Sequence, residues 1–312
     1  MDDSAREAAA PDSLHAPQAH RVSDAGPLAA FAVLALIWGY NWVVMKIALR
    51  YAGPIEFALL RVGIAVLVMF ALLMALRIPL RPADVRKTIW LGLFQTTGFI
   101  GLMSWSLSFG EVGKSAVLAY TMPFWVIVLG WPFLHERLQG RQWPAVGLAL
   151  VGLVLVLELW APAGSAASSF VALGAGAAWG ISVIIAKKIP VRGRDELLSL
   201  TSWQMLFGFI PLAAAALLVE EPPIDWSGYF IGALIFNAVG ATAIATLLWL
   251  YIVQRLPATV SGLSALIVPI IGVGAAWVQL GERPDLFETI GMALILAALA
   301  LLASTRRVSA PQ

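Results

Sequence analysis

Long apolar stretches and short polar connections follow one another along nearly the whole chain. A helix of roughly 20 apolar residues crosses a bilayer core about 30 Å thick. Apolar and polar residues do not alternate within the stretches, as they do in the strands of a membrane barrel, so we expect helices. The sequence therefore predicts an all-α integral membrane protein with ten transmembrane helices. The expected spans are Pro27–Leu49, Pro54–Leu76, Thr88–Phe109, Ala116–Leu134, Trp143–Leu159, Ala166–Ala186, Leu197–Val219, Trp226–Val253, Ala258–Leu280 and Leu286–Ser304.

Composition agrees with this pattern and narrows the function. Hydrophobic residues make up 60% of the 312 residues and charged residues 12%, whereas soluble domains have about 45–50% and 25%. The absence of cysteine excludes disulfides, cysteine-ligated clusters and thiol catalysis. His135-Glu136 lacks the second histidine of a zinc-protease motif, and no Gly-x-Ser-x-Gly motif occurs. We therefore expect no enzyme, catalytic residue, metal, cofactor or nucleic-acid partner.

The basic residues predict the orientation in the membrane. Lys and Arg gather in cytoplasmic loops of membrane proteins. With the N-terminus inside, Arg50, Lys114 and Arg283 alone fall in outside loops. We therefore expect both termini in the cytoplasm and the chain in the inner (plasma) membrane, with residues 1–26 and 306–312 as cytoplasmic tails, the first of them disordered. The inside set is Arg6, Arg21, Arg77, Arg81, Arg86, Lys87, Arg137, Arg141, Lys187, Lys188, Arg192, Arg194, Arg255, Arg306 and Arg307.

The two halves of the chain resemble each other. Four pairs carry the repeat: Ile37-Trp38-Gly39 with Ala178-Trp179-Gly180, Phe94-Gln95-Thr96-Thr97-Gly98 with Phe236-Asn237-Ala238-Val239-Gly240, Pro123 with Pro269, and Glu136-Arg137 with Glu282-Arg283. Residues 27–160 and 161–305 then hold five spans each, and an odd number inserts the second half upside down. Inverted repeats recur among secondary transporters, because the two halves can open a shared site to either side in turn.

These motifs resemble the EamA-type drug/metabolite transporters over about residues 27 to 305. The resemblance rests on Ile-Trp-Gly-Tyr-Asn-Trp at 37–42 followed by Lys46, on Leu60-Arg61, on Pro123 followed by Glu136-Arg137, and on Pro269 followed by Gly281-Glu282-Arg283-Pro284. It implies a basket-like bundle of ten helices around a central cavity, which exports amino acids, metabolites or drugs. Among the relatives, the chain looks similar to exporters of aromatic and other neutral amino acids.

Polar and aromatic residues near the middle of the spans are the candidates for lining the cavity. Amide side chains are costly against lipid, so Asn41, Gln95 and Asn237 should face the bundle interior. The alternative is that they only join helices by hydrogen bonds. A neutral polar cavity with aromatic walls suits amino acids better than phosphates, which would require two or more central cations. The candidates are Trp38, Tyr40, Asn41, Gln95, Thr96, Tyr120, Trp179, Ser182, Asn237, Thr242 and Ser264.

Charged residues inside the spans bear on the coupling of transport. No acidic residue or histidine lies at mid-span, and buried carboxylates are the usual proton relays of pumps. A facilitator, or a carrier coupled by other means, is therefore expected. Lys46 and Arg61 lie toward the outer ends of their spans, where snorkelling to the headgroups or pairing with Glu56 is favoured over gripping a substrate carboxylate.

Prolines and tryptophans add two further expectations. Pro123 and Pro269 each remove a backbone hydrogen bond inside a span, which predicts kinks that act as paired hinges. Trp38, Trp125 and Trp179 lie deep enough to line the cavity, and the tryptophans expected at the membrane interfaces are Trp90, Trp143, Trp226, Trp249 and Trp277.

The sequence thus predicts a secondary transporter that moves small neutral metabolites, amino acids including aromatic ones first among them, by alternating access. A multidrug exporter of the same superfamily is the alternative, ahead of a non-transport membrane protein or an enzyme. The partners expected are a small-molecule substrate and the lipid bilayer. A monomer is compatible with the pattern, and the sequence does not fix the oligomeric state.

Overall fold

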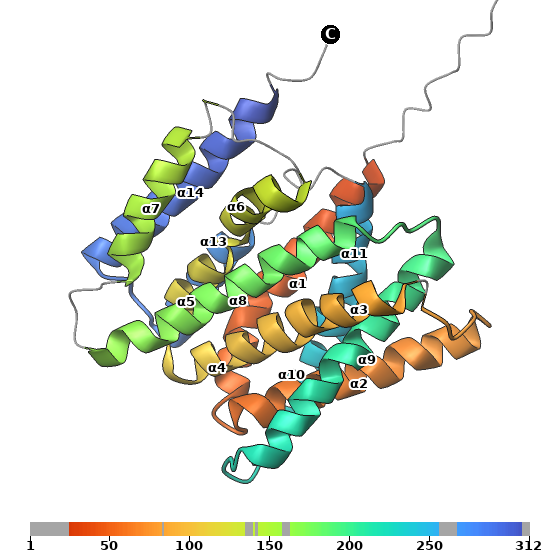
Figure 1. The fold of residues 1–312 in the computed structure, drawn as a ribbon. Helices are drawn as coiled ribbons and strands as arrows, with labels where there is room; N and C mark the ends of the chain where they lie inside the picture. Colours follow the sequence, from red (N-terminus) through yellow and green to blue (C-terminus); the bar gives the residue numbers. More distant parts are fainter. Residues whose placement is uncertain are drawn as a thin grey trace, which may run out of the picture.

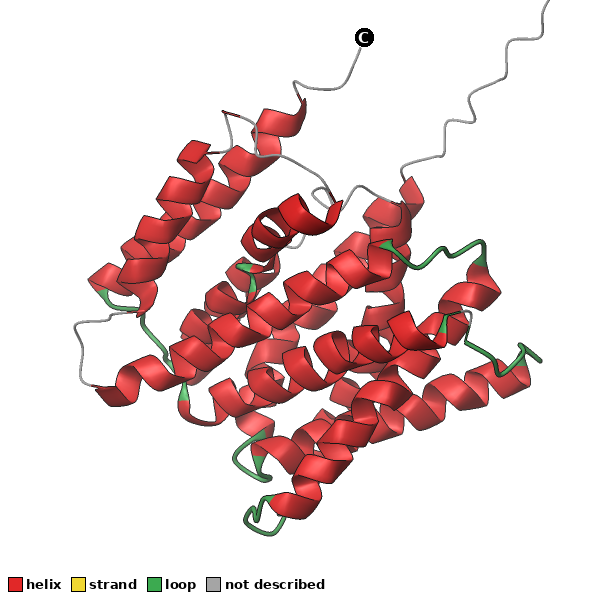
Figure 2. Ribbon diagram, in the orientation of Figure 1, coloured by secondary structure: helices red, strands yellow, loops and turns green. Residues whose placement is uncertain are grey.

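The computed structural model describes residues 25–82, 84–134, 140, 143–157, 163–255 and 267–307. In these residues the regular structure is entirely helical (Figure 2). Five helical stretches are long and apolar enough to cross a membrane, and the chain is a multi-pass membrane protein. They are Ala29–Ala48, Pro54–Ala75, Ala166–Lys187, Arg194–Leu218 and Gly228–Arg255. The count of ten spans stays a prediction.

Local sequence explains where several helices of the first half begin. Pro54 opens α2, because the first turn of a helix does not need the missing proline N–H. The Asp84 side chain caps α3 by accepting a hydrogen bond from Lys87 N at 3.0 Å. The elements are α1 (Ala25–Ala48), α2 (Pro54–Ala75), α3 (Val85–Gly92), η1 (Leu93–Gly101), α4 (Leu102–Phe109), α5 (Val112–Ala119), α6 (Met122–Leu134) and α7 (Trp143–Leu157).

Local sequence also explains a helix start in the second half. The Ser227 hydroxyl caps α10 by accepting a hydrogen bond from Phe230 N at 3.2 Å. The elements are α8 (Ala163–Lys187), α9 (Arg194–Leu218), α10 (Gly228–Ile235), η3 (Phe236–Ile244), α11 (Ala245–Arg255), α13 (Ile267–Leu280) and α14 (Leu286–Arg307). The expected span Ala258–Leu280 falls partly outside the described residues.

A π-helix interrupts the third long helix of each half. η1 joins α3 to α4 without a break, and η3 joins α10 to α11 in the same way. The two π-helices contain the paired motifs Phe94–Gly98 and Phe236–Gly240. A π-helix has wider i→i+5 hydrogen bonding, is rare, and often marks a functional site.

The helices of the two halves pack against each other in matching pairs (Figure 1). α1 of the first half lies against α13 of the second half, and α8 of the second half lies against α6 of the first. In addition, α2 packs on α9, and α7 packs on α14. A Cβ atom added at Gly39 would lie 2.5 Å from Ile271 Cγ2, and one added at Gly180 would lie 2.6 Å from Trp125 Cβ. The repeated Trp-Gly pair therefore permits a close helix crossing in both halves.

Buried aliphatic and aromatic residues fill the bundle, while other large apolar side chains face outward. Leu217 and Leu218 are 88% and 84% exposed, and Val278 is 84% exposed. A soluble protein of this size seldom exposes so much apolar surface. The outward-facing side chains suit contact with lipid.

The predicted kink at Pro123 requires a correction. The helix is interrupted before the proline, at Tyr120 and Thr121, and Pro123 is the second residue of α6. In the first turn the missing N–H breaks no hydrogen bond, so Pro123 starts a new helix instead of bending an existing one. Pro269 is the third residue of α13.

Candidate functional site

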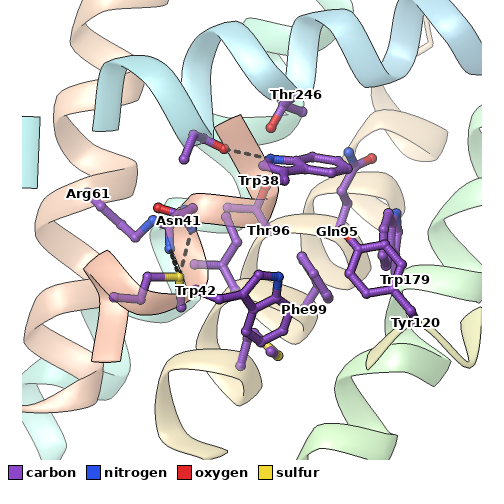
Figure 3. A pocket seen from close by; sticks show the side chains of 14 residues that line it. Trp38, Asn41, Trp42, Arg61, Gln95, Thr96, Phe99, Tyr120, Trp179 and Thr246 are labelled. Atoms are coloured by element: carbon purple, nitrogen blue, oxygen red, sulfur yellow. Dashed lines mark hydrogen bonds between the residues drawn. The ribbon is translucent and has the colours of Figure 1, made fainter. Parts of the chain in front are cut away.

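A pocket opens inside the bundle between both halves of the chain (Figure 3). The space between its walls, including the open mouth, is about 620 Å³. Most of its lining comes from α1 and η1. The lining residues are Trp38, Asn41, Trp42, Met45, Arg61, Gln95, Thr96, Phe99, Ile100, Met103, Tyr120, Trp179, Ala241 and Thr246.

An aromatic cluster centred on Trp179 forms one wall of the pocket. The Trp179 ring centroid lies 4.8 Å from that of Phe99, 5.1 Å from that of Tyr120 and 5.5 Å from that of Trp38. Behind it, Trp249 lies 5.2 Å from Trp179, and both are almost fully buried. Several ring pairs are edge-on, a favourable arrangement for aromatic rings. The cluster is a rigid apolar surface that suits the side chain of an aromatic or aliphatic solute.

Two amide side chains place unused acceptors in the pocket. Asn41 and Gln95 are each 6% exposed, and no hydrogen bond reaches Asn41 Oδ1 or Gln95 Oε1 from the described residues. Burying a polar atom without a partner is costly. A ligand that donates hydrogen bonds would remove that cost.

Arg61 is the charged residue of the pocket. It is 4% exposed, its Nε donates to Thr242 Oγ1 at 3.0 Å, and its Nη1 donates to Met45 Sδ at 3.1 Å. The preference for snorkelling or for pairing with Glu56 is therefore wrong for Arg61. The reason is packing, because α2 lies against η3 and α1 lines the same pocket, which encloses the guanidinium within the bundle.

Lys46 follows neither of the favoured alternatives. Its ammonium donates to Leu107 O at 2.8 Å and to Gly110 O at 2.5 Å, where α4 ends. A cation there satisfies terminal carbonyls and suits the negative end of the helix dipole. Lys46 thus joins α1 to the end of α4, and it does not line the pocket.

Two carboxylates from the second half cap helices of the first half at the same end of the bundle. Glu221 accepts from Ile55 N at 3.0 Å and from Glu56 N at 2.8 Å, at the start of α2. Glu282 accepts from Val112 N at 2.8 Å, at the start of α5. Carboxylates stabilise helix N-termini, so these caps hold the two halves together at this end.

Comparison with known proteins identifies the family. The model of the EamA-like transporter family matches residues 26–158 and again residues 167–304. This chain belongs to the EamA-like transporter family. It is therefore a transporter, and the family resemblance expected from the Trp-Gly and Glu-Arg motifs is confirmed.

Curated relatives of this EamA-family chain match over most of their length. An uncharacterized transporter, YoaV, of Bacillus subtilis is 25% identical, covering 84% of this chain and 91% of the relative. A probable amino-acid metabolite efflux pump of Salmonella typhimurium is 27% identical, covering 86% and 91%. A probable terminal-alkyne amino-acid exporter of Streptantibioticus cattleyicolor is 24% identical, covering 88% and 92%.

The fold itself has been seen before. A crystal structure of a protein superposes with a TM-score of 0.66 at 17% identity, covering 92% of this chain and 99% of that chain. At this identity the likeness concerns the fold alone.

The structure brings together about half of the candidate residues of this transporter. Trp38, Asn41, Gln95, Thr96, Tyr120 and Trp179 all line the pocket. Thr242 lies behind the lining, where it accepts the hydrogen bond from Arg61. Ser264 falls outside the described residues.

Three candidates lie elsewhere. Tyr40 is 44% exposed and donates to Gln279 Oε1 at 3.4 Å. Ser182 donates to Trp179 O at 2.7 Å, and Asn237 Nδ2 donates to Ala233 O at 2.9 Å, both within their own helices. For Asn237, the alternative weighed above, a structural hydrogen bond, is what the structure has. The bond stays within one helix, however, and does not join two helices.

Several lining residues escaped the sequence analysis, and helical spacing could have found them. Trp42 and Met45 follow Trp38 by four and seven residues, so they share its helix face. Phe99 and Met103 follow Gln95 by four and eight residues. Arg61 had been weighed for a contact with a substrate carboxylate, which was the less favoured alternative, and Ile100, Ala241 and Thr246 gave no comparable signal.

The expected tryptophan positions need one correction. Trp90, Trp143, Trp226 and Trp277 are exposed, as interface residues should be. Trp249 is 1% exposed and packs on Trp179, so its interpretation as an interface residue is wrong. Trp249 lies in the last helical segment of its expected span, but it is on the helix face that is turned to the centre of the bundle. Trp125 packs across Gly180 and does not line the pocket.

Proposed function

We propose that this chain exports small neutral metabolites, above all amino acids including aromatic ones, from the cytoplasm across the inner membrane. The observation that carries the proposal is the pocket itself, whose lining combines rings of the Trp179 cluster with Asn41 and Gln95, the two amides whose oxygens have no partner among the described residues. An aromatic wall beside a few polar groups suits an amphipathic solute. The names of two relatives, a probable amino-acid metabolite efflux pump and a probable terminal-alkyne amino-acid exporter, support the same substrate class.

The transport mode proposed is alternating access by two inverted five-helix repeats, residues 27–160 and 161–305, with both termini in the cytoplasm. Three observations support it. The family model matches the chain twice. The helices of the two halves pack in matching pairs, α1 on α13 and α8 on α6. A π-helix lies on the repeated motif in each half. Two such halves can rock about a site between them.

The pocket also bears on energy coupling. None of the described residues that line it is acidic, and proton-coupled carriers commonly bind the proton on a buried carboxylate. We therefore propose a facilitator, or a carrier coupled by a route that does not use a pocket carboxylate. Transport that required a pH gradient and was abolished by Glu56→Gln or Glu288→Gln would contradict this.

Uptake into liposomes tests the function. The purified protein is reconstituted, and entry of radiolabelled phenylalanine, tryptophan and leucine is followed with and without a pH gradient. Saturable uptake that unlabelled amino acids suppress, and that ignores the pH gradient, is the expected result. Protein-free liposomes give the background, and Tyr40→Phe, which alters a side chain outside the pocket, gives the matched variant. Transport of cationic dyes without any amino acid would reassign the chain to drug export.

A further inference from the structure

Arg61 is a charged residue enclosed in the bundle without an ion-pair partner. No carboxylate among the described residues pairs with it, and its two hydrogen bonds go to a neutral hydroxyl and a thioether sulfur. A buried charge is costly unless it is paired, and thioether sulfur is a weak acceptor. Neither bond uses Nη2 of the guanidinium. The guanidinium therefore keeps a donor that these two bonds do not use.

The amide of Asn41, with its unused acceptor, lies next to the Arg61 guanidinium. Asn41 Nδ2 lies 2.9 Å from Met45 Sδ, and Arg61 Nη1 lies 3.1 Å from the same sulfur (Figure 3). The Asn41 amide and the guanidinium are therefore neighbours across one atom. A cationic donor group and an anionic acceptor group of one small ligand would satisfy both sides.

We propose that the pocket binds the zwitterionic head of an α-amino acid, with the carboxylate on Arg61 and the ammonium on Asn41 Oδ1. The substrate side chain then lies against the aromatic cluster of Trp179. This inference rests on the proposed function and names how its substrate is recognised. It replaces the earlier preference for a purely structural Arg61.

Charge and geometry favour a carboxylate over other anions. A planar guanidinium presents a fork of N–H groups that matches a carboxylate. Arg61 is the one cation among the described lining residues, and a doubly charged phosphate would leave charge unpaired in the pocket. Cationic drugs would meet a like charge. The same residue thus separates amino acids from both rival substrate classes.

Competition binding with three matched ligands tests the assignment. Radiolabelled L-phenylalanine bound to purified protein is displaced by unlabelled L-phenylalanine, by L-phenylalaninamide, which lacks the carboxylate, and by 3-phenylpropionate, which lacks the ammonium. For wild type we expect both analogues to bind more weakly than phenylalanine. In Arg61→Met the preference for the acid over the amide should fall about 10- to 100-fold, as loss of a charged hydrogen bond predicts.

The acceptor variant should have the complementary effect. Asn41→Leu should lower the preference for phenylalanine over 3-phenylpropionate and leave the preference over the amide unchanged. Lys46→Met is the matched control. It removes the second cation that lies within a predicted span, and Lys46 does not line the pocket. Its two preferences should equal those of wild type. Ratios of affinities compare ligands on the same folded molecules, and Arg61→Lys, which keeps the charge, should retain part of the acid preference.

The outcomes separate this inference from the proposed function. Equal acid-to-amide ratios in wild type and Arg61→Met, with phenylalanine still transported, would overturn the role of Arg61 alone. If no amino acid is bound or transported, the proposed function fails. Direct binding of radiolabelled 3-phenylpropionate then decides the role of Arg61. Binding of that acid by wild type and its loss in Arg61→Met would uphold the carboxylate site. Absence of binding by wild type would overturn it.

Discussion

The π-helices η1 and η3 share a motif and a place in their halves, yet they serve the pocket differently. η1 contributes Gln95, Thr96, Phe99 and Ile100 to the lining, whereas η3 contributes Ala241. The amide of η1 faces the pocket. Its counterpart in η3, Asn237, is fully buried and donates within its own helix.

The neighbours of the two segments differ as well. η1 crosses α9 closely, where Thr96 Oγ1 donates to Gln204 Oε1 at 2.8 Å and Thr97 Oγ1 donates to Gly208 O at 2.7 Å. η3 supports pocket residues of the first half, because Trp38 Nε1 donates to Ala241 O at 3.0 Å. A repeat can therefore keep its backbone while one copy provides the binding surface and the other holds that surface in place.

The largest expected effect is on the crossing of η1 with α9. A Cβ atom at Gly208 would lie 2.4 Å from Thr96 Cβ and 2.5 Å from Gly92 O. Overpacking of this kind costs about 1–3 kcal/mol, so Gly208→Ala should lower the melting temperature in detergent. Gly240→Ala in η3 is the matched control, since its Cβ would meet Phe236 at 3.6 Å. Equal melting temperatures for the two variants would refute the difference between the segments.

The paired amides come next. Gln95→Leu should raise the KM for a transported amino acid about two- to tenfold, as the loss of one hydrogen bond between a lining amide and the substrate predicts. Asn237→Leu should leave KM within about twofold, because the Asn237 side chain does not line the pocket. Liposome uptake measures both. A similar rise in KM for the two variants would mean that η3 also contacts substrate.

The bond from α1 to η3 should have a moderate effect. Trp38→Phe removes the hydrogen bond to Ala241 O but keeps a ring in the pocket wall, which should cost about 0.5–1.5 kcal/mol of stability. Trp42→Phe removes a similar ring area, and Trp42 makes no hydrogen bond to η3 among the described residues, so this variant serves as the control. Thermal unfolding of both variants provides the measurement, and an equal loss of stability in each would discount the bond.

The smallest expected effect concerns the carboxylate caps that the second half gives to the first. Glu282→Gln keeps an acceptor for Val112 N but loses the charge at the start of α5, which is worth about 0.3–1 kcal/mol. Because the chain contains no cysteine, maleimide labelling of an introduced Ala276→Cys reports this end specifically. Labelling should be about two- to fivefold faster in Glu282→Gln. Glu220→Gln, at an exposed carboxylate, should not change it, and an equal rate in Glu282→Gln would rule out the cap.

Much of the helical layout was predictable from local chemistry. Pro54 marks a helix start because the first turn does not need its missing N–H. Asp84 and Ser227 mark helix starts because their side chains accept hydrogen bonds from backbone N–H groups of the first turn. The repeated Trp-Gly pair pointed to equivalent sites, and both glycines lie at close crossings between the halves. These signals act within a few residues, so a single sequence carries them.

The burial of Arg61 and Trp249 was not predictable in the same way. Position along a span gives depth in the membrane, but it does not give the face that turns to the bundle centre. Arg61 is enclosed because η3, about 180 residues later in the chain, packs on its helix. The π-helices were also missed, since a window average of hydropathy does not respond to one wider turn of backbone.

The wider turns of the π-helices set the rotation between the α-helical segments on either side of them. Each residue of an α-helix advances the direction of the side chains by about 100°, so a shift of hydrogen bonding from i→i+4 to i→i+5 amounts to one extra residue in the register. Removing one residue from η1 would turn Phe99, Ile100 and Met103 through roughly that angle relative to the helix before it. The π-helix therefore rotates the helix that follows it, and this rotation sets which side chains face the pocket. A carrier of this kind can alter its specificity by insertion or deletion of a residue as well as by substitution.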